Sequence, residues 1–346
     1  MKLLEPTNTS YTLLQDLALH FAFYWFLAVY TWLPGVLVRG VAVDTGVARV
    51  PGLGRRGKRL LLAAVAVLAL VVSVVVPAYV AYSSLHPESC RPVAPEGLTY
   101  KEFSVTAEDG LVVRGWVLGP GAGGNPVFVL MHGYTGCRSA PYMAVLAREL
   151  VEWGYPVVVF DFRGHGESGG STTIGPREVL DARAVVGYVS ERFPGRRIIL
   201  VGFSMGGAVA IVEGAGDPRV YAVAADSPYY RLRDVIPRWL EYKTPLPGWV
   251  GVLAGFYGRL MAGVDLGFGP AGVERVDKPL LVVYGPRDPL VTRDEARSLA
   301  SRSPCGRLVE VPGAGHVEAV DVLGPGRYAD MLIELAHEEC PPGAGG

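Results

Sequence analysis

The pattern of hydrophobic and polar positions divides the chain into two parts. From about residue 100 to residue 336, short apolar runs alternate with longer segments in which apolar positions recur at helical spacing. This alternation predicts an α/β fold with a mostly parallel sheet and helices on both faces. The first two strands, Lys101–Thr106 and Leu111–Leu118, are expected to be antiparallel. Further strands are predicted at Val127–Met131, Pro156–Phe162, Arg197–Gly202 and Val220–Ala225, and helices at Tyr142–Trp153, Arg177–Arg192 and Met205–Glu213.

The regular alternation breaks between residues 228 and 276 and then resumes. Two further strands are predicted at Pro279–Gly285 and Leu308–Val311. The interrupted segment is rich in aromatic residues, and its run Trp249–Tyr257 is apolar but too short to cross a bilayer. Two interpretations stay open: a lid with an apolar surface for an acyl group, or helices that simply pack on the core.

Two long uncharged segments precede this α/β part of the chain. Residues 60–82 contain no charged side chain and are long enough to cross a hydrocarbon core of roughly 30 Å. Residues 17–38 also lack Asp, Glu, Lys and Arg, and they are rich in aromatic residues. We therefore predict a membrane region over residues 1–99 with two spans. The alternatives are an interfacial or partner-packed helix for residues 17–38 and a buried core helix for residues 60–82.

The charges around these segments predict their orientation. The loop of residues 39–59 carries six Lys and Arg residues against one acidic residue, and the flanks of the pair are sparsely charged. Because positive residues stay on the cytoplasmic side, the loop is expected inside and the C-terminal part outside. The loop also contains a Gly-x-Gly-x-x-Gly match at Gly52–Gly57, which we reject as a dinucleotide site because no strand precedes it.

The composition narrows the class of protein further. The formal net charge is −1 over 346 residues, so nothing indicates a nucleic-acid partner. The cysteines show no metal-ligand spacing, and an extracytoplasmic location permits disulfides with three connectivities. Of these we favour the Cys305–Cys340 pair, which flanks the last strand and helix. We expect Cys137 to be a disulfide partner or a small buried residue rather than a reactive nucleophile.

The strongest chemical signal is Gly202–Gly206, a Gly-x-Ser-x-Gly between a predicted strand and a predicted helix. In this context the sequence is typical of a nucleophile elbow, whose sharp turn presents Ser204 above the sheet. Serine needs a base to become nucleophilic, and the base needs an orienting acid. Asp288 and His316 each follow a predicted strand downstream, in the order Ser, acid, His. Asp294 and Glu295 are the rival acids.

Two backbone N–H groups are candidates for the oxyanion hole. The strand Val127–Met131 is followed by His132–Gly136, where we expect the N–H of Tyr134 to be one donor. The N–H of Met205, next to the nucleophile, is expected to be the other. His132 is expected to position this loop, and His165 and Glu167 to stabilise the turn after the strand that ends at Phe162.

With these motifs in register, residues 100–336 resemble the α/β-hydrolase superfamily, and within it the Bem46-like and serine aminopeptidase-like (hydrolase-4) branch. The matching segments are His132–Gly136, Asp161–Ser168, Gly202–Gly206, Gly285–Asp288 and Gly315–His316. The resemblance implies an α/β-hydrolase domain over residues 100–340 with a lid insertion at 228–276, and a short tail at 341–346. It does not identify the substrate, because this fold supports many chemistries.

These observations predict a membrane-anchored serine hydrolase that cleaves small-molecule or lipid-like carboxylic esters through an acyl-enzyme. Membrane lipids are the other expected partners, and neither a metal nor an organic cofactor is expected. Two rivals remain. The first is a serine peptidase with the same triad, for which Glu241 or Asp234 could bind a peptide amine. The second is a membrane-tethered binding protein on a non-catalytic hydrolase fold.

Overall fold

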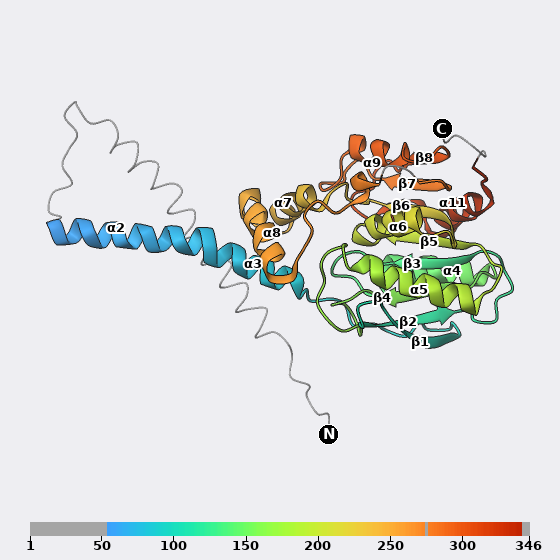
Figure 1. The fold of residues 1–346 in the computed structure, drawn as a ribbon. Helices are drawn as coiled ribbons and strands as arrows, with labels where there is room; N and C mark the ends of the chain where they lie inside the picture. The colour runs from blue at the N-terminus through green and yellow to red at the C-terminus, as the bar shows by residue number, and fades with distance from the viewer. Residues whose placement is uncertain (1–53, 274–275, 341–346) are drawn as a thin grey trace, which may run out of the picture. The chain divides into compact units, whose positions relative to one another are not determined.

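A computed structural model describes residues 54–273 and 276–340 (Figure 1). The chain divides into two compact units, Met1–Val72 with Thr244–Leu246, and Ser73–Lys243 with Pro247–Gly346. The described part of the first unit consists mainly of α2 (Arg55–Leu70), most of whose apolar side chains are exposed. Along the chain follow η1 (Val71–Val75) and α3 (Val76–Leu85). The predicted span 17–38 and the tail 341–346 lie outside the described residues.

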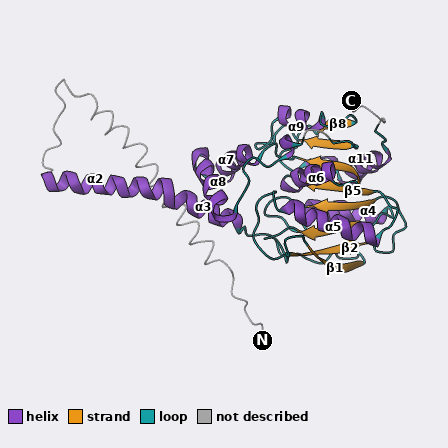
Figure 2. Ribbon diagram, viewed as in Figure 1, coloured by secondary structure: helices purple, strands orange, loops and turns teal. Residues whose placement is uncertain are grey.

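The second unit is built on an eight-stranded sheet with the strand order β1-β2-β4-β3-β5-β6-β7-β8 (Figure 2). The β1–β2 and β2–β4 pairs are antiparallel, and the remaining pairs are parallel, which confirms the predicted sheet. Each strand lies within a few residues of its predicted position: β1 (Tyr100–Thr106), β2 (Val112–Leu118), β3 (Val127–Met131), β4 (Val157–Asp161), β5 (Ile198–Phe203), β6 (Val220–Asp226), β7 (Leu280–Tyr284) and β8 (Gly306–Glu310).

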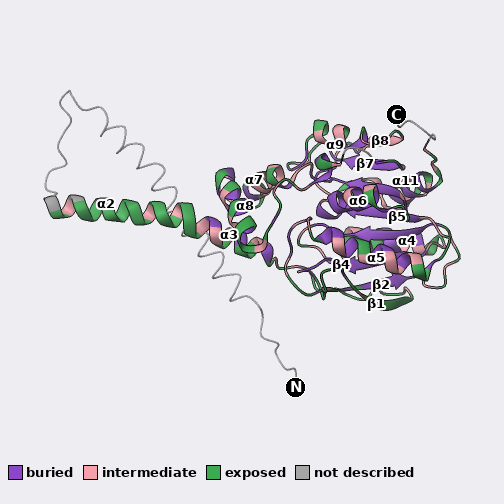
Figure 3. Ribbon diagram, in the orientation of Figure 1, coloured by how far each residue is buried: buried purple, intermediate pink, exposed green. Residues whose placement is uncertain are grey.

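Helices cover both faces of this sheet, which explains why its central strands are apolar at every position. Alternate strand residues point to opposite faces, so Leu200 belongs to one core cluster and Ile199 to the other. The first cluster includes residues of α5 (Glu178–Arg192), α6 (Met205–Gly216) and α9 (Arg293–Ala300). The second includes residues of α4 (Pro141–Glu152), α10 (Ala319–Leu323) and α11 (Pro325–His337). Figure 3 shows the buried strands between them.

The insertion between β6 and β7 contains α7 (Leu232–Lys243), α8 (Gly248–Ala262) and η2 (Pro270–Gly272). Helix α8 packs against both α7 and α3. Its buried positions carry mostly small residues, whereas its exposed positions include large apolar side chains. The insertion is therefore a helical layer whose inner face contacts protein and whose outer face is unusually apolar.

The boundary between the two units lies between Val72 and Ser73. Residues 73–99 belong to the second unit, because Ala81 and Leu85 of α3 are buried there and Cys90 forms a disulfide with Cys137. The sequence could not place this boundary, since an uncharged helix satisfies the pattern of a membrane span and of a packed helix alike. By length and composition Arg59–Leu85 is apolar enough to cross a membrane, with a mean hydropathy of 3.0 over an 18-residue window.

Candidate active site

Ser204 lies in a sharp turn between β5 and α6, and its backbone has a φ of +51°. Such a φ is rare for a residue with a side chain and marks local strain. The flanking glycines are sterically required: a Cβ on Gly202 would collide with the carbonyl of Gly206, and one on Gly206 with the carbonyl of Met131. The turn is secured by the Ser204 N–H, which donates to the carbonyl of Asp226 at 2.8 Å. The local sequence thus folds in the way that a nucleophile elbow requires.

The structure brings the three candidate triad side chains into one hydrogen-bonded chain. His316 Nε2 lies 2.8 Å from Ser204 Oγ, and His316 Nδ1 lies 2.8 Å from Asp288 Oδ2. Ser204 follows β5, Asp288 follows β7 and His316 follows β8, so the carboxyl ends of three parallel strands deliver them to one edge of the sheet. This geometry allows His316 to accept the serine proton while Asp288 holds the opposite ring nitrogen.

The loops fix both partners of the candidate base. The Asp288 side chain is fully buried, and its Oδ1 accepts the N–H groups of Leu290 at 2.7 Å and Val291 at 3.1 Å, which leaves Oδ2 for His316. The rival acids are occupied elsewhere: Asp294 pairs with Arg297 on the surface, and Glu295 completes the capping box of α9. Of the three acidic residues, the structure therefore places Asp288 against the histidine.

A second buried carboxyl group lies close to the loop after β8 that carries His316, which is called the histidine loop below. Asp226 ends β6, and burial raises its pKa to about 6. Its side chain accepts from the hydroxyl groups of Ser227 at 2.9 Å and Tyr328 at 3.2 Å. Ser227 Oγ in turn accepts the N–H of Val317 at 3.0 Å, next to His316. Sequence reasoning missed this network, which links the loop after β8 to β6 and so positions the imidazole.

The candidate oxyanion donors lie on either side of Ser204. Met205 is the first residue of α6, where N–H groups have no intrahelical acceptor and the helix dipole favours negative charge. Tyr134 follows β3 and lines the same pocket as Ser204 and Met205. The intervening Gly133 is close to the nucleophile, since a Cβ on it would lie 3.4 Å from the Ser204 Cβ. The loop after β3 and the start of α6 therefore both lie close to Ser204.

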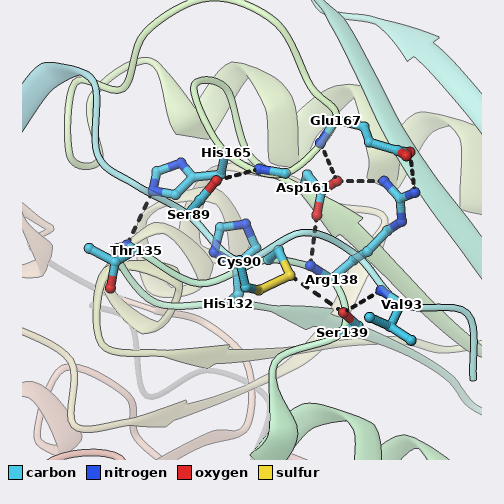
Figure 4. Close-up of a disulfide and its surroundings, with 12 residues drawn as sticks. Ser89, Cys90, Val93, His132, Thr135, Arg138, Ser139, Asp161, His165 and Glu167 are labelled. Carbon is cyan, nitrogen blue, oxygen red and sulfur yellow. Dashed lines mark hydrogen bonds and ion pairs between the residues drawn. A yellow bond between two sulfur atoms is a disulfide. The ribbon is translucent and has the colours of Figure 1, made fainter. Parts of the chain in front are cut away.

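Two neutral histidines hold the loop after β3 in place. His132 Nδ1 donates to the Gly133 carbonyl at 2.7 Å, and its Nε2 accepts the N–H of Phe162 at 3.0 Å. His165 repeats this pattern, since its Nδ1 donates to the Arg163 carbonyl and its Nε2 accepts from Thr135 at 3.3 Å (Figure 4). Each ring must be neutral to accept. Burial lowers the pKa of His132 to about 3 and also lowers that of His165.

Acidification is expected to destabilise the protein through His132. Its folded-state pKa lies below its unfolded value near 6.5, so between about pH 6.5 and pH 3 the unfolded state binds more protons. The free energy of unfolding therefore falls as pH falls through this window. His132→Gln keeps an acceptor near the Nε2 position but does not titrate.

The measurement compares urea unfolding of the wild type and of His132→Gln at pH 7 and pH 4.5. We expect the loss on acidification to be smaller in the variant by roughly 2 kcal/mol. The exposed His337 provides the matched control, His337→Gln. Equal acid sensitivity of wild type and His132→Gln would contradict this account.

A charge network supports the segment Asp161–Ser168. The buried carboxylate of Asp161 accepts from the N–H groups of Arg138 at 2.7 Å and Glu167 at 2.9 Å, and it pairs with the Arg138 guanidinium (Figure 4). The Glu167 carboxylate also pairs with Arg138. Glu167 and His165 thus stabilise the turn through their contacts, as the sequence indicated.

The structure contains two disulfides, Cys90–Cys137 and Cys305–Cys340. The second is the pair that the sequence favoured, and the first shows that Cys137 is a disulfide partner. Figure 4 shows the Cys90 side chain beside the loop after β3. The segment after α3 is thereby covalently attached next to the candidate oxyanion loop.

The pocket above Ser204 is apolar. Its lining includes Tyr229 and Trp239 from the aromatic-rich insertion, together with residues of α3 that sequence reasoning assigned only to the membrane. Among the described residues that line it there is no Asp, Glu, Lys or Arg. The two carboxylates considered for binding a peptide amine lie elsewhere: Glu241 accepts the N–H of Gly248 at 2.7 Å, and Asp234 pairs with Arg233.

Comparisons with known proteins agree with this fold and with a hydrolase class. A family model described as "Serine aminopeptidase, S33" matches residues 125–266. The solved esterase Pf2001 of Pyrococcus furiosus is 30% identical, with a TM-score of 0.61, over 74% of this chain and 99% of that one. A monoacylglycerol lipase of Mycolicibacterium smegmatis is 28% identical over 63% of this chain and 90% of its own length.

A human relative matches over a shorter region. Protein ABHD15 of Homo sapiens is 30% identical over 172 residues, so the match spans only 35% of that protein and 45% of this chain. The doubly wound sheet with a serine at the strand–helix turn defines the class as a serine hydrolase. The near-complete coverage of the Pyrococcus furiosus esterase then gives the family: the chain belongs to the α/β-hydrolase superfamily.

Proposed function

We propose that this serine hydrolase cleaves carboxylic esters with an apolar acyl group, using Ser204, His316 and Asp288 as its catalytic triad. The observation that carries the proposal is the hydrogen-bonded chain Asp288–His316–Ser204, which ends in a pocket lined by apolar side chains. The esterase and lipase named among the relatives support the same class of substrate.

The geometry supports an acyl-enzyme mechanism. Ser204 Oγ attacks the ester carbonyl while His316 Nε2 takes its proton, and Asp288 stabilises the imidazolium through Nδ1. The oxyanion forms toward the N–H groups of Tyr134 and Met205, donors of a kind that each contribute about 3 to 4 kcal/mol to transition-state stabilisation. His316 then protonates the leaving alcohol. Water attacks the acyl-enzyme with His316 again as base, which releases the acid.

The peptidase alternative has less support in the pocket. An aminopeptidase needs a group that recognises the substrate ammonium, and the described pocket residues supply no carboxylate for it. The binding-protein alternative leaves the complete hydrogen-bonded chain unexplained. Both alternatives are tested by the labelling experiment below.

The experiment is labelling of the full-length protein with a fluorophosphonate probe, followed by peptide mass spectrometry. We expect the adduct on Ser204, together with hydrolysis of nitrophenyl esters and no hydrolysis of aminoacyl nitroanilides. Ser301→Ala, at an exposed serine after α9, is the control and should label like the wild type. Nitroanilide cleavage would favour the peptidase, and a folded protein without labelling would favour the binding protein.

We further propose that the enzyme is anchored in a membrane through two spans, residues 17–38 and 60–82, with the hydrolase domain on the extracytoplasmic side. The basic loop between the spans supports this orientation, and two disulfides in the hydrolase unit are typical of an oxidising compartment. The apolar length of Arg59–Leu85 supports the second span.

The insertion supplies a surface suited to contact with lipid. Helix α8 exposes Trp249, Val252, Phe256 and Leu260 along one face, and an exposed apolar row of this kind is unusual on a soluble protein. We propose that this face of the lid contacts the bilayer. Protease added to intact cells tests the topology: cleavage of the hydrolase domain before lysis supports it, and cleavage only after lysis contradicts it.

A further inference from the structure

Helix α3 is firmly attached to the catalytic core. The Tyr134 hydroxyl donates to the Ser84 carbonyl at 2.9 Å, and the Thr172 N–H donates to the Leu85 carbonyl at 3.1 Å. Beyond the helix, the Gly166 N–H donates to Ser89 Oγ at 2.8 Å, and the Cys90–Cys137 disulfide follows. Because Tyr134 also belongs to the candidate oxyanion loop, the end of α3 and that loop are held in a fixed relation.

Helices α3 and α8 lie against each other and enclose the inner part of the pocket. On α8 the lining positions include Gly251, Ala254, Gly255 and Gly258, which recur at helical spacing on one face. Small side chains at such positions allow close approach of a neighbouring helix or ligand. On α3 the lining positions are Val80, Ala81, Ser84 and Leu85. The same cavity reaches Ser204, so the space between the two helices continues to the nucleophile.

The shape and chemistry of this cavity favour an unbranched hydrocarbon chain. The cavity has a volume of about 70 Å³. The described lining is mostly apolar and carries no charged side chain, and the hydroxyl groups of Tyr134 and Tyr229 already donate to backbone carbonyls. A charged or strongly hydrated chain would therefore lose its solvation there without compensation.

We propose that α3, the end of the apolar N-terminal helix, is a wall of the acyl-binding site, and that Val80 and Ala81 set the acyl chain length. This inference rests on the proposed ester hydrolase function and names its substrate class, esters of unbranched aliphatic acids. The acyl chain lies between α3 and α8 with its carbonyl at Ser204. Helix α3 therefore has a second role beside attachment to the membrane.

Two leucine substitutions on α3 separate a role in substrate selection from a role in attachment. Ala81 is buried and lines the cavity, so Ala81→Leu places three more carbon atoms in the acyl site. Ser83 lies on the exposed side of the same helix, so Ser83→Leu adds a similar apolar side chain outside the site. If α3 had only a structural role, both substitutions would change the stability of the protein without changing its preference among acyl chains.

The readout is kcat/KM of the full-length protein in detergent for nitrophenyl acetate and nitrophenyl octanoate. We expect the octanoate-to-acetate ratio to fall by about tenfold or more in Ala81→Leu, because each methylene excluded from the site costs about fourfold in binding. Ser83→Leu should keep the wild-type ratio. Val80→Ala, which enlarges the cavity, should raise the ratio of decanoate to octanoate.

The possible outcomes separate a failure of the acyl-wall assignment from a failure of the proposed ester hydrolase function. Wild-type protein that hydrolyses no ester contradicts the proposed function itself. Active wild-type protein whose octanoate-to-acetate ratio is the same in Ala81→Leu, or falls equally in Ser83→Leu, overturns the acyl-wall assignment and leaves the ester hydrolase function intact. Melting temperatures of all variants identify any loss of activity that follows from unfolding, and the ratio is unaffected by the fraction of active protein.

Discussion

Ester hydrolysis is expected to fall on the order of 10⁵-fold or more in kcat when Ser204 is replaced with alanine. The Ser204 hydroxyl is the group aligned on His316 Nε2 at 2.8 Å, and its removal leaves the base without a nucleophile to activate. A loss of this size corresponds to about 7 kcal/mol of transition-state stabilisation. Residual catalysis by the oxyanion donors and by substrate binding determines the rate that remains in the variant.

The variant should remain folded, since the hydrogen bond that secures the turn comes from the backbone N–H of residue 204 to Asp226. Alanine in place of serine keeps that N–H and adds no volume. Nitrophenyl butyrate turnover and circular dichroism measured on the same samples separate activity from folding. Ser301→Ala should retain wild-type turnover. Activity of Ser204→Ala within a hundredfold of wild type would show that another residue is the nucleophile.

The proximity of these site residues follows from features that are local in the sequence. Each of Ser204, Asp288 and His316 comes directly after an apolar run, and parallel strands end at one edge of a sheet. The helical insertion was also visible, because the alternation of strands and helices stops after Ser227 and resumes at β7. Such elements can be predicted from the local sequence without knowledge of the distant residues that they contact.

The remaining parts of the site depend on contacts that no local pattern encodes. The role of α3 in the pocket requires α8 to pack against it, although the two helices are far apart in the chain. The Cys90–Cys137 pair was one of several arrangements that the spacing allowed. The buried Asp226 network needs Ser227, the loop after β8 and Tyr328 together. Such features become apparent only when the chain is folded.

Helix α3 also shows why hydropathy alone was ambiguous. A membrane span and a helix packed on protein both exclude charge, so residues 60–82 fit a span by composition. The distinction lies in the faces of the helix: Tyr79 and Tyr82 are exposed, whereas Ala81 and Leu85 are buried. Tyrosine is common where a membrane helix reaches the polar interface, which is consistent with the proposed anchor ending near these residues.

Asp288→Asn is expected to lower kcat about 10⁴-fold while preserving the fold. Asp288 Oδ1 accepts two backbone N–H groups, from Leu290 and Val291, and an asparagine satisfies both with its carbonyl oxygen. That orientation directs the asparagine NH2 group at His316 Nδ1, where the aspartate accepted a hydrogen bond. The imidazole must then carry its proton on Nε2, and it can no longer accept the proton of Ser204.

The matched control is Asp294→Asn, which removes the same charge from an exposed position close in the chain, where it pairs only with Arg297 on the surface. Steady-state hydrolysis of nitrophenyl butyrate should be near wild type in this variant, because surface ion pairs contribute little. Retention of more than a tenth of wild-type kcat in Asp288→Asn would exclude Asp288 as the acid. The buried Asp226 behind the histidine loop would then be the next residue to replace, since its carboxyl group already acts on that loop through Ser227.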